Sequence, residues 1–439
     1  MMRCVALIVL LLPVIGFAQT VEVKAEEDVY KFVNPNNGSG PLWDYGSTNI
    51  ARCGDDVYVS QQETGDGVPP LSNTRWRLLK RAADGWTMIA EQDKFIQREP
   101  CPLGVMGRTV FMSINPSTQP PGTKYGNCVP QVLRFSFAGD QLAQAVFTPV
   151  WNKEHNFTDH SYRGFAVDSQ AQRMLLLNID AKTSEQHACL MNAAGETLGN
   201  ASVSFPIRAC YPQVALRGTA VHVLAVSDIV EPVEEWKSYK FEQTKATWDY
   251  VFRILYYTTT PDVTKTGFAA PIEIANVDKT AGAISNQDLW LSREGEAYIL
   301  YTEREVASSL IRDKFFPGKS IVTFLHLAVV KDGVVASRRV LYAGTDAAQC
   351  GHARFHVAAD GTVYAVMIVS GPDAGNKLMQ VHPAFDNAPL LPIPVKKPMS
   401  SYCLAGVRAG NAPSNTIDLL GQSAGDTMSY VQIALTPAK

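Results

Sequence analysis

Four side chains that can move protons or bind anions lie within nine residues of this sequence. They are His155, His160, Tyr162 and Arg163, and an apolar run begins directly after them. Histidine or a deprotonated tyrosine can act as a general base, and arginine neutralises a carboxylate through two parallel hydrogen bonds. Removal of a proton next to a carboxylate requires both kinds of group. The segment therefore predicts acid-base chemistry on a carboxylate-bearing substrate.

The same residue types recur where later apolar segments begin. Together they form the set expected for β-elimination on a uronic acid, in which the C5 proton leaves and the glycosidic bond at C4 breaks. We expect the catalytic residues to be His155, His160, Tyr162 and Tyr211. We expect substrate to be bound by Arg163, Arg208, His352, Arg354, Asn286 and Trp236. The residues alone leave open whether His160 or Tyr211 is the base, and Arg208 or Arg163 could hold the carboxylate.

A repeated hairpin must position these residues. Each copy is a short strand, a tight turn with Gly or Asp, and a second strand, which is a hairpin signal. Seven copies recur at spacings of roughly 50 to 75 residues, as in propeller blades with insertions. They cover residues 48–60, 101–113, 162–177, 211–224, 288–300, 356–366 and 402–420.

The sequence predicts an all-β fold, a seven-bladed β-propeller with four-stranded antiparallel blades. A second hairpin follows the first in most copies, for instance over residues 75–89 and 327–336. After the seventh copy, residues 428–435 supply only a third strand, so we expect residues 21–32 to complete that blade and close the ring. Closure removes sheet edges that would otherwise promote aggregation. Helical periodicity is scarce, and only residues 306–316 resemble a short helix.

In such a blade, the loops before the first strand and the loops between the second and third strands share one face, here named the top face. The turns of the other, bottom face are short. The longest loops of the top face are predicted at residues 228–250 and 303–319, and the first contains Trp236 and Trp248. Long aromatic loops on one face of a rigid scaffold usually serve binding. We therefore expect the candidate residues to surround the central opening of the top face.

The chain ends and the charge suggest where the protein works and what it binds. Residues 1–18 have the short apolar run and small residues of a signal peptide, so we expect residues 19–439 to form one domain that is secreted or periplasmic. No later segment is apolar enough to cross a membrane, and we expect a monomer. A net charge of −3 gives no basic field for nucleic acid. An acidic polysaccharide or oligosaccharide, held by a few arginines, is the expected partner.

Seven cysteines remain after the signal segment. In an oxidising compartment they could form up to three disulfides and leave one thiol. The repeat alignment places three pairs near one another on the top face, which suggests disulfides between Cys101 and Cys128, Cys189 and Cys210, and Cys350 and Cys403. Pairing would require the Cα atoms of each pair to lie within about 7 Å.

Two segments resemble a known group of proteins. His160-Ser-Tyr-Arg-Gly-Phe-Ala-Val-Asp and His352-Ala-Arg-Phe-His-Val-Ala-Ala-Asp-Gly-Thr-Val-Tyr are similar to segments of secreted seven-bladed propellers with BNR-type repeats. That group includes lyases that cleave ulvan and related rhamnose-glucuronate polysaccharides. The resemblance implies a catalytic role for histidine, tyrosine and arginine on one propeller face. His155 and His160 match the histidines, Tyr211 the tyrosine, and Arg208 or Arg163 the carboxylate partner.

Two other functions compete with a lyase. A sialidase-like glycoside hydrolase would use a pair of carboxyl groups, for which Glu99, Asp159 and Asp288 are candidates, but the Ser-x-Asp-x-Gly-x-x-Trp box is missing. A non-catalytic propeller could bind glycans on Trp236 and Trp248. No cofactor is required for any of these functions. A structural metal ion, zinc or calcium, stays open, although His352 and His356 are about 13 Å apart on an extended strand and could not share one ion.

Overall fold

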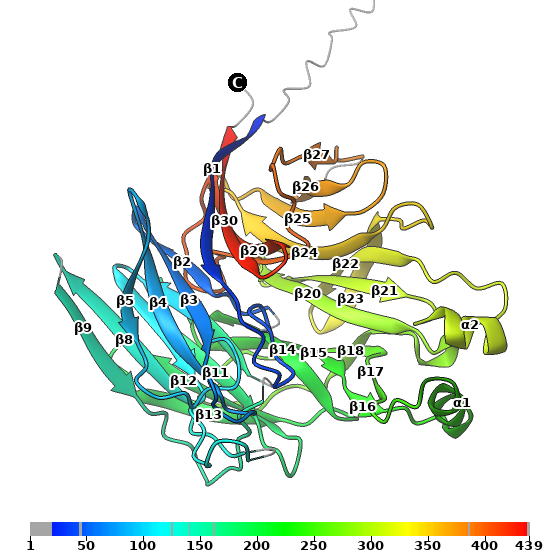
Figure 1. Ribbon diagram of the computed structural model, residues 1–439, viewed down its shortest axis with the longest axis horizontal. Helices are drawn as coiled ribbons and strands as arrows, with labels where there is room; N and C mark the ends of the chain where they lie inside the picture. Colours follow the sequence, from blue (N-terminus) through cyan, green and yellow to red (C-terminus); the bar gives the residue numbers. More distant parts are fainter. Residues whose placement is uncertain are drawn as a thin grey trace, which may run out of the picture.

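The computed structural model describes residues 20–43, 46–123, 126–139, 141–160, 163–384 and 387–436. It contains seven four-stranded antiparallel sheets that follow one another around a ring, which confirms the predicted seven-bladed β-propeller (Figure 1). The predicted signal segment, residues 1–18, lies outside the described residues. Among the residues that are described, no helix has the length and apolarity needed to span a membrane.

The blades are numbered in chain order, and each begins with its innermost strand. Blade 1 consists of β2 (Ile50–Cys53), β3 (Asp56–Thr64), β4 (Thr74–Ala82) and β5 (Gly85–Glu91). Blade 2 consists of β6 (Leu103–Met106), β7 (Thr109–Ile114), β8 (Gln131–Ala138) and β9 (Gln141–Phe147). Blade 3 consists of β10 (Gly164–Asp168), β11 (Arg173–Ile179), β12 (Gln186–Asn192) and β13 (Thr197–Val203). Blade 4 consists of β14 (Ala209–Arg217), β15 (Ala220–Ser227), β18 (Ile254–Thr260) and β19 (Ile272–Asn276). Blade 5 consists of β20 (Ala283–Leu291), β21 (Ala297–Arg304), β22 (Thr323–Lys331) and β23 (Val334–Tyr342). Blade 6 consists of β24 (Cys350–Val357), β25 (Val363–Val369), β26 (Gly375–His382) and β27 (Leu391–Pro392). Blade 7 consists of β28 (Ser401–Leu404), β29 (Thr416–Ala424), β30 (Thr427–Thr436) and β1 (Thr20–Lys31).

The N-terminal strand closes the ring, as the sequence predicts. β1 pairs antiparallel with β30 from Thr20 opposite Thr436 to Lys31 opposite Thr427, and the two strands lie side by side in Figure 1. The inner strands of the blades are largely buried because neighbouring blades cover both of their faces, although β20 and β24 also carry polar and charged residues. One core cluster, for example, joins Val59 of blade 1 to Leu420 and Tyr430 of blade 7.

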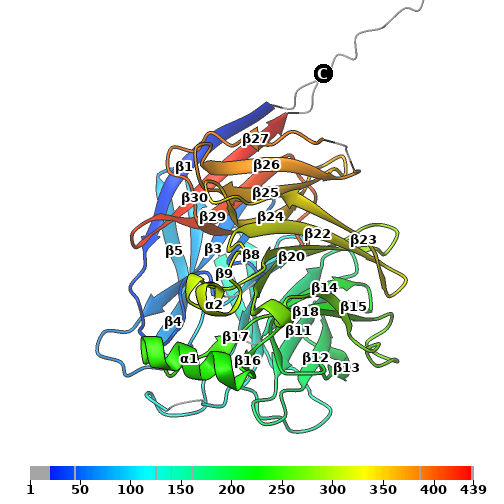
Figure 2. The same cartoon turned by 90° about the vertical axis from the view of Figure 1, so that its right-hand side faces the viewer.

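Two helices extend the top face over blades 4 and 5. The predicted helix is present as α2 (Ser309–Phe315), and Ser308 caps it by accepting a hydrogen bond from the Ile311 N–H. The long loop of blade 4 contains a second helix, α1 (Glu234–Thr244), and the short hairpin of β16 (Ile229–Val230) and β17 (Tyr250–Val251). Figures 1 and 2 both show α1 beside α2.

Helix α1 has no fully buried residue, and an ionic network links it to blade 4. The carboxylate of Glu231 accepts hydrogen bonds of 2.9 and 2.6 Å from the Arg253 guanidinium and one of 2.7 Å from the Lys240 ammonium. Burial alone would raise the pKa of Glu231, but Arg253 and Lys240 outweigh it, and the pKa is lowered. The insertion is therefore fixed to the blade by an ionic network.

The centre of the ring is filled by two connecting segments. Residues 405–415, between β28 and β29, enter the channel, where the carbonyl oxygens of Arg408 and Ala409 accept hydrogen bonds from Val167 and Val105. Arg408 also lies 2.6 Å from the Asp288 carboxylate and donates to the carbonyl oxygen of Gly46. Gly46 belongs to the segment between β1 and β2, which reaches the channel from blade 1. The propeller therefore has a packed centre.

The predicted disulfides are wrong. The seven described cysteines are all buried, and no disulfide joins any of them. Their side chains belong to different parts of the core or bond elsewhere: Cys189 and Cys210 lie in separate clusters, as do Cys350 and Cys403. The Cys128 thiol donates to the Thr158 carbonyl oxygen at 3.0 Å. Blade alignment gave the correct strands but could not give the direction of each side chain.

Buried histidines make stability depend on pH. Burial lowers the pKa of His222 and of His356 to about 4, whereas an unfolded histidine has a pKa of about 6.5. Between these values the unfolded chain binds protons that the folded chain does not, so the free energy of unfolding falls as the pH falls from about 6.5 to about 4. Urea unfolding at a series of pH values should show this decrease, with a flatter slope for His356→Gln. An unchanged slope in that variant would contradict the assignment.

Candidate functional site

His160 and Glu99 form a close imidazole–carboxylate pair on the top face. Nδ1 of His160, in the segment before β10, lies 2.6 Å from Oε1 of Glu99, in the segment before β6. The side chain of His160 is 19% exposed and that of Glu99 is 3% exposed. A buried carboxylate that accepts the Nδ1 proton fixes the orientation of the imidazole ring. The sequence analysis named Glu99 only as a candidate carboxyl group of the competing hydrolase and did not predict its contact with His160.

Further charges lie beneath this pair. Asp159 is buried, accepts a hydrogen bond of 2.6 Å from the Ser72 hydroxyl, and lies 3.6 Å from Nη1 of Arg98. Burial raises the pKa of Asp159, against the lowering effect of Ser72 and Arg98. Arg163 is buried as well and donates to the Pro100 carbonyl oxygen. His160 is the most exposed side chain of this cluster, and the other groups are buried under it.

Tyr211 lies at the start of the next blade, where its backbone conformation is unusual and its ring is packed between two others. Its φ is +53°, in the left-handed region that L-residues with large side chains rarely adopt, at a bulge in the β14–β15 pairing. The ring is 9% exposed and contacts the rings of Trp43 and Phe252, with centroid distances of 6.2 and 5.6 Å. Gly164, directly after Arg163, packs against Val214 and faces the Pro212 carbonyl oxygen. The two blade starts are therefore neighbours.

Arg208 lies at the rim of blade 4 next to exposed aromatic rings. Its Nη1 donates to the carbonyl oxygen and the carboxylate of Asp228, each at 2.9 Å, and its guanidinium lies 5.7 Å from the centroid of the Tyr250 ring. Tyr250 in turn packs against Trp248, which is 67% exposed. The arrangement combines a cation with stacking surfaces, which suits a sugar ring that bears a carboxylate.

Trp236 does not form the expected platform. It lies on α1, where its ring contacts Phe315 and Phe316 of the α2 region and covers the guanidinium of Arg253 at 5.1 Å. These contacts hold the two helices together. Trp248, at the other end of the same insertion, is the exposed ring.

Three other predicted binding residues serve contacts between blades. Asn286 donates to the Tyr211 carbonyl oxygen at 2.7 Å, and Nη1 of Arg354 donates to the carbonyl oxygens of Gln287 and Ala353. Nε2 of His352 lies 2.7 Å from the carbonyl oxygen of Tyr402. Burial, followed by the charge of Arg354, lowers the pKa of His352 well below its usual value. The structure does not bring these side chains to His160.

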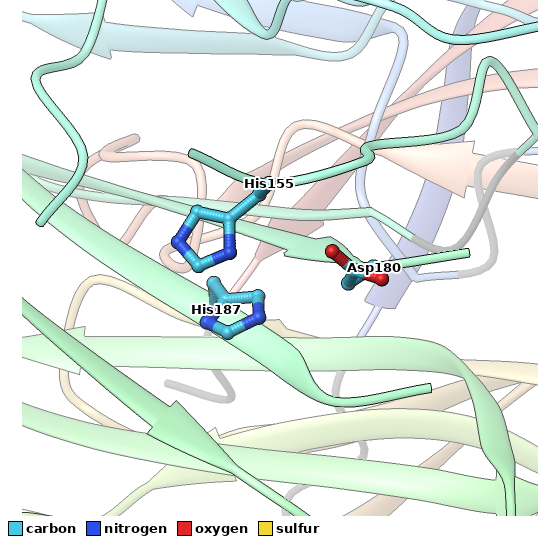
Figure 3. Close-up of side chains that lie close together, drawn as sticks. All are labelled: His155, Asp180 and His187. Carbon is cyan, nitrogen blue, oxygen red and sulfur yellow. The ribbon is translucent and has the colours of Figure 1, made fainter. Parts of the chain in front are cut away.

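His155 lies in a second group on the outer part of blade 3. Its ring stacks on that of His187 with a centroid distance of 3.7 Å, close to Asp180 (Figure 3). Sequence reasoning missed His187, although it is the second residue of β12 and thus follows a loop of the top face. Tyr162, the fourth member of the predicted catalytic set, lies outside the described residues. The nine-residue segment therefore does not form a single reactive cluster.

The bottom face carries a cavity that the sequence analysis did not predict. It has a volume of about 950 Å³ and is lined by turns that include Arg217, Arg293, Asp360 and His382. Arg217 donates to three carbonyl oxygens of the β20–β21 turn, and Asp360 accepts from the Thr362 N–H. Much of its polar lining therefore shapes tight turns. Among these described groups, Nδ1 of His382 lies 3.0 Å from the hydroxyl of Tyr298, and no contact of His382 with a carboxylate like that of His160 is seen.

The comparisons with known proteins concern the fold. No protein-family model matches the chain, and no curated protein matches it by sequence. Among solved structures, it is similar to the polysaccharide lyase Uly1, with 9% identity, a TM-score of 0.50, and coverage of 94% of this chain and 99% of the other. It is also similar to a PL25 ulvan lyase, with 10% identity, a TM-score of 0.50, and coverage of 94% and 95%. It is also similar to an α-L-arabinanase of Penicillium chrysogenum, with 9% identity, a TM-score of 0.47, and coverage of 94% of this chain and 98% of the other.

The two likenesses with a TM-score of 0.50 concern the fold alone. Identities near 10% do not transfer a reaction from one propeller to another, because propellers host many functions. A choice between elimination and hydrolysis must therefore be based on the side chains of this protein.

Proposed function

We propose that this protein is a polysaccharide lyase that cleaves a uronic-acid-containing glycan, such as ulvan or another rhamnose-glucuronate polymer, by β-elimination. The proposal depends on one observation above all, the 2.6 Å contact between Nδ1 of His160 and the buried carboxylate of Glu99. Two of the structural neighbours, Uly1 and the PL25 ulvan lyase, carry out reactions of this class, and this supports a carbohydrate-active enzyme. The substrate would bind to the top face.

In the proposed reaction, Nε2 of His160 takes the proton from C5 of the uronate. The electron pair of the C5–H bond becomes the C4–C5 double bond as the C4–O bond breaks, and the leaving oxygen takes a proton. Tyr211, at the start of the neighbouring blade, is the proposed donor of that proton. Glu99 stabilises the imidazolium that forms on His160, as a buried carboxylate does beside a catalytic histidine. Proton transfer by a positioned side chain contributes about 100- to 10,000-fold to a rate.

The carboxylate of the substrate would be bound at the rim of blade 4. Arg208 lies there next to Tyr250 and the exposed ring of Trp248. A sugar ring stacked on these aromatics would place its carboxylate near the guanidinium, in competition with Asp228. Neutralisation of that carboxylate increases the acidity of the C5 proton. Arg163 is too deeply buried for this contact.

Burial of the candidate carboxyl groups argues against a retaining hydrolase. The side chains of Glu99, Asp159 and Asp288 are 3%, 0% and 8% exposed. Each is also bound to a neighbour: Glu99 to His160, Asp159 to Ser72, and Asp288 to Arg408. A retaining hydrolase needs one carboxylate at the anomeric carbon and another at the leaving oxygen. An imidazole is the partly exposed group here, which suits proton abstraction.

A panel of acidic polysaccharides tests the proposal. Elimination leaves a conjugated double bond at the new non-reducing end, so ultraviolet absorbance should rise with at least one rhamnose-glucuronate polymer. A neutral polymer of the same size serves as the control substrate. If folded protein releases reducing ends without that absorbance, it is a hydrolase. If it binds the glycans and releases nothing, it is a binding propeller.

A further inference from the structure

Three metal-binding side chains from three separate segments of blade 3 meet on the top face. His155 comes from the segment before β10, Asp180 directly follows β11, and His187 is the second residue of β12. One ligand atom from each lies within 4.8 Å of those of the other two. Figure 3 shows both imidazoles and the carboxylate turned toward one another. Elsewhere in the described chain no other group of this kind is found.

We propose that His155, Asp180 and His187 bind one divalent transition-metal ion, with zinc as the best fit. Two imidazole nitrogens and one carboxylate oxygen are a common ligand set of zinc, which leaves its remaining position for water or a further protein ligand. Calcium and magnesium prefer sites built only from oxygen atoms, and two nitrogen ligands disfavour both.

The two imidazole rings lie close together. Their ring centroids are 3.7 Å apart, and the two planes meet at 34°.

The carboxylate of Asp180 is held in place by backbone groups. Oδ1 accepts hydrogen bonds from the N–H groups of Lys182 and Thr183, at 2.8 and 3.1 Å, and Oδ2 accepts one from Asn156 at 2.9 Å. Burial alone would raise the pKa of Asp180, but these hydrogen bonds outweigh it, and the pKa is lowered. A carboxylate accepts about four hydrogen bonds in total, so Oδ2 keeps a position for a metal. Hydrogen bonds of this kind fix metal ligands in their orientation.

Glu185 provides a further carboxylate beside the cluster. Its Oε2 lies 3.4 Å from Nε2 of His187, and its other oxygen accepts a hydrogen bond from Ser202. Lys153 lies 3.8 Å from the same Oε2, but its side chain is 63% exposed and can move into solvent. Coordination by Glu185 would give zinc four protein ligands, which is typical of a structural site.

Aromatic packing is the competing explanation of the cluster. The rings of Trp151 and Phe157 contact His155, so the two histidines could simply extend an aromatic group. Packing alone does not require an ionised carboxylate beside both imidazoles. A metal would also fasten the segment before β10 to the loop after β11. Since that segment continues to His160, an effect of the metal on catalysis is expected, and this last point rests on the proposed function.

Zinc binding to tag-free protein, treated with a chelator and then dialysed, tests the site. Isothermal titration with zinc chloride should show one tight equivalent per chain, and native mass spectrometry should show one retained ion. His187→Gln and Asp180→Asn should each weaken binding by about 100-fold or more, since ligand loss exceeds the effect of losing an outer partner. Cobalt substitution should give a visible spectrum typical of nitrogen and oxygen ligands, and His155→Gln should abolish it.

Two variants keep this test decisive. His155 is more exposed than His187, so His155→Gln should remain folded even if His187→Gln does not. His382, which packs against Trp290 and Tyr298 away from the cluster, provides the matched control His382→Gln, which should bind zinc like the unmodified chain. If the chain retains no zinc at micromolar concentrations, or if His155→Gln binds it equally well, the proposal is wrong. Because no glycan is present, failure of the lyase proposal would leave this result unaffected.

Discussion

Replacement of His160 by alanine is expected to lower kcat on a uronate glycan by about 100- to 10,000-fold, the contribution of a positioned general base. The variant removes the only partly exposed base of the pair and leaves Glu99 in place. Glu99→Gln should lower kcat by about 100-fold or more, because a glutamine cannot stabilise the imidazolium that forms on His160. The initial rate of double-bond formation measures both effects.

Two controls separate catalysis from folding. His382→Gln, on the bottom face, should keep the full rate, and the urea midpoint of His160→Ala should stay close to that of the unmodified chain. The side chain of Glu99 is only 3% exposed, so its replacement can also loosen the top face. A Glu99→Gln variant with normal stability and an unchanged rate would show that the contact with His160 has no part in the reaction.

Arg408→Met is expected to lower the free energy of unfolding by about 3 kcal/mol, at the lower end of the range for breaking a buried ion pair. Arg408 lies 2.6 Å from Asp288, and their side chains are only 13% and 8% exposed. Its guanidinium also donates to the carbonyl oxygens of Gly46 and Val214. The methionine has a similar length but leaves Asp288 charged and without this partner. Urea unfolding measures the loss.

A second substitution tests the cause of this loss. Asn at position 288 removes the charge and keeps an oxygen that can accept from the Phe355 N–H, which donates to Asp288 at 2.8 Å. The double variant Arg408→Met with Asp288→Asn should therefore regain part of the stability that Arg408→Met loses. Equal stability of Arg408→Met and the unmodified chain would mean that the segment 405–415 does not hold the centre of the ring.

The sequence was sufficient for the architecture because each blade follows a local pattern. Alternation, tight turns and the repeat predicted the seven hairpins and the pairing of β1 with β30. The segments that fill the channel follow no such pattern. Arg408 contacts Gly46 and Val214, which lie hundreds of residues away in the chain, and only the closed ring brings them together. These contacts occupy the centre where the sequence analysis expected an open mouth.

The sequence analysis named His160 as a catalytic candidate but did not predict its contact with Glu99. The two residues meet because neighbouring blades bring the segments before their first strands together. His155 lies apart from His160 because the segment from Asn156 pairs with the loop after β11. In this pairing, the Ala181 N–H donates to the Asn156 carbonyl oxygen at 2.9 Å. Helix α1 was missed because its polar sequence has no apolar stripe, although Pro232 and the acidic pair Glu234 and Glu235 are helix-start signals.

The mass of the reaction products tests the central claim most directly. A defined rhamnose-glucuronate oligosaccharide is incubated with the protein in water enriched in heavy oxygen, and the fragments are weighed. Proton abstraction by His160 predicts an unsaturated fragment that is lighter by one water than its hydrolytic counterpart, with no heavy oxygen in either new end. Saturated fragments that carry heavy oxygen would instead show hydrolysis and would contradict the proposed role of the His160–Glu99 pair.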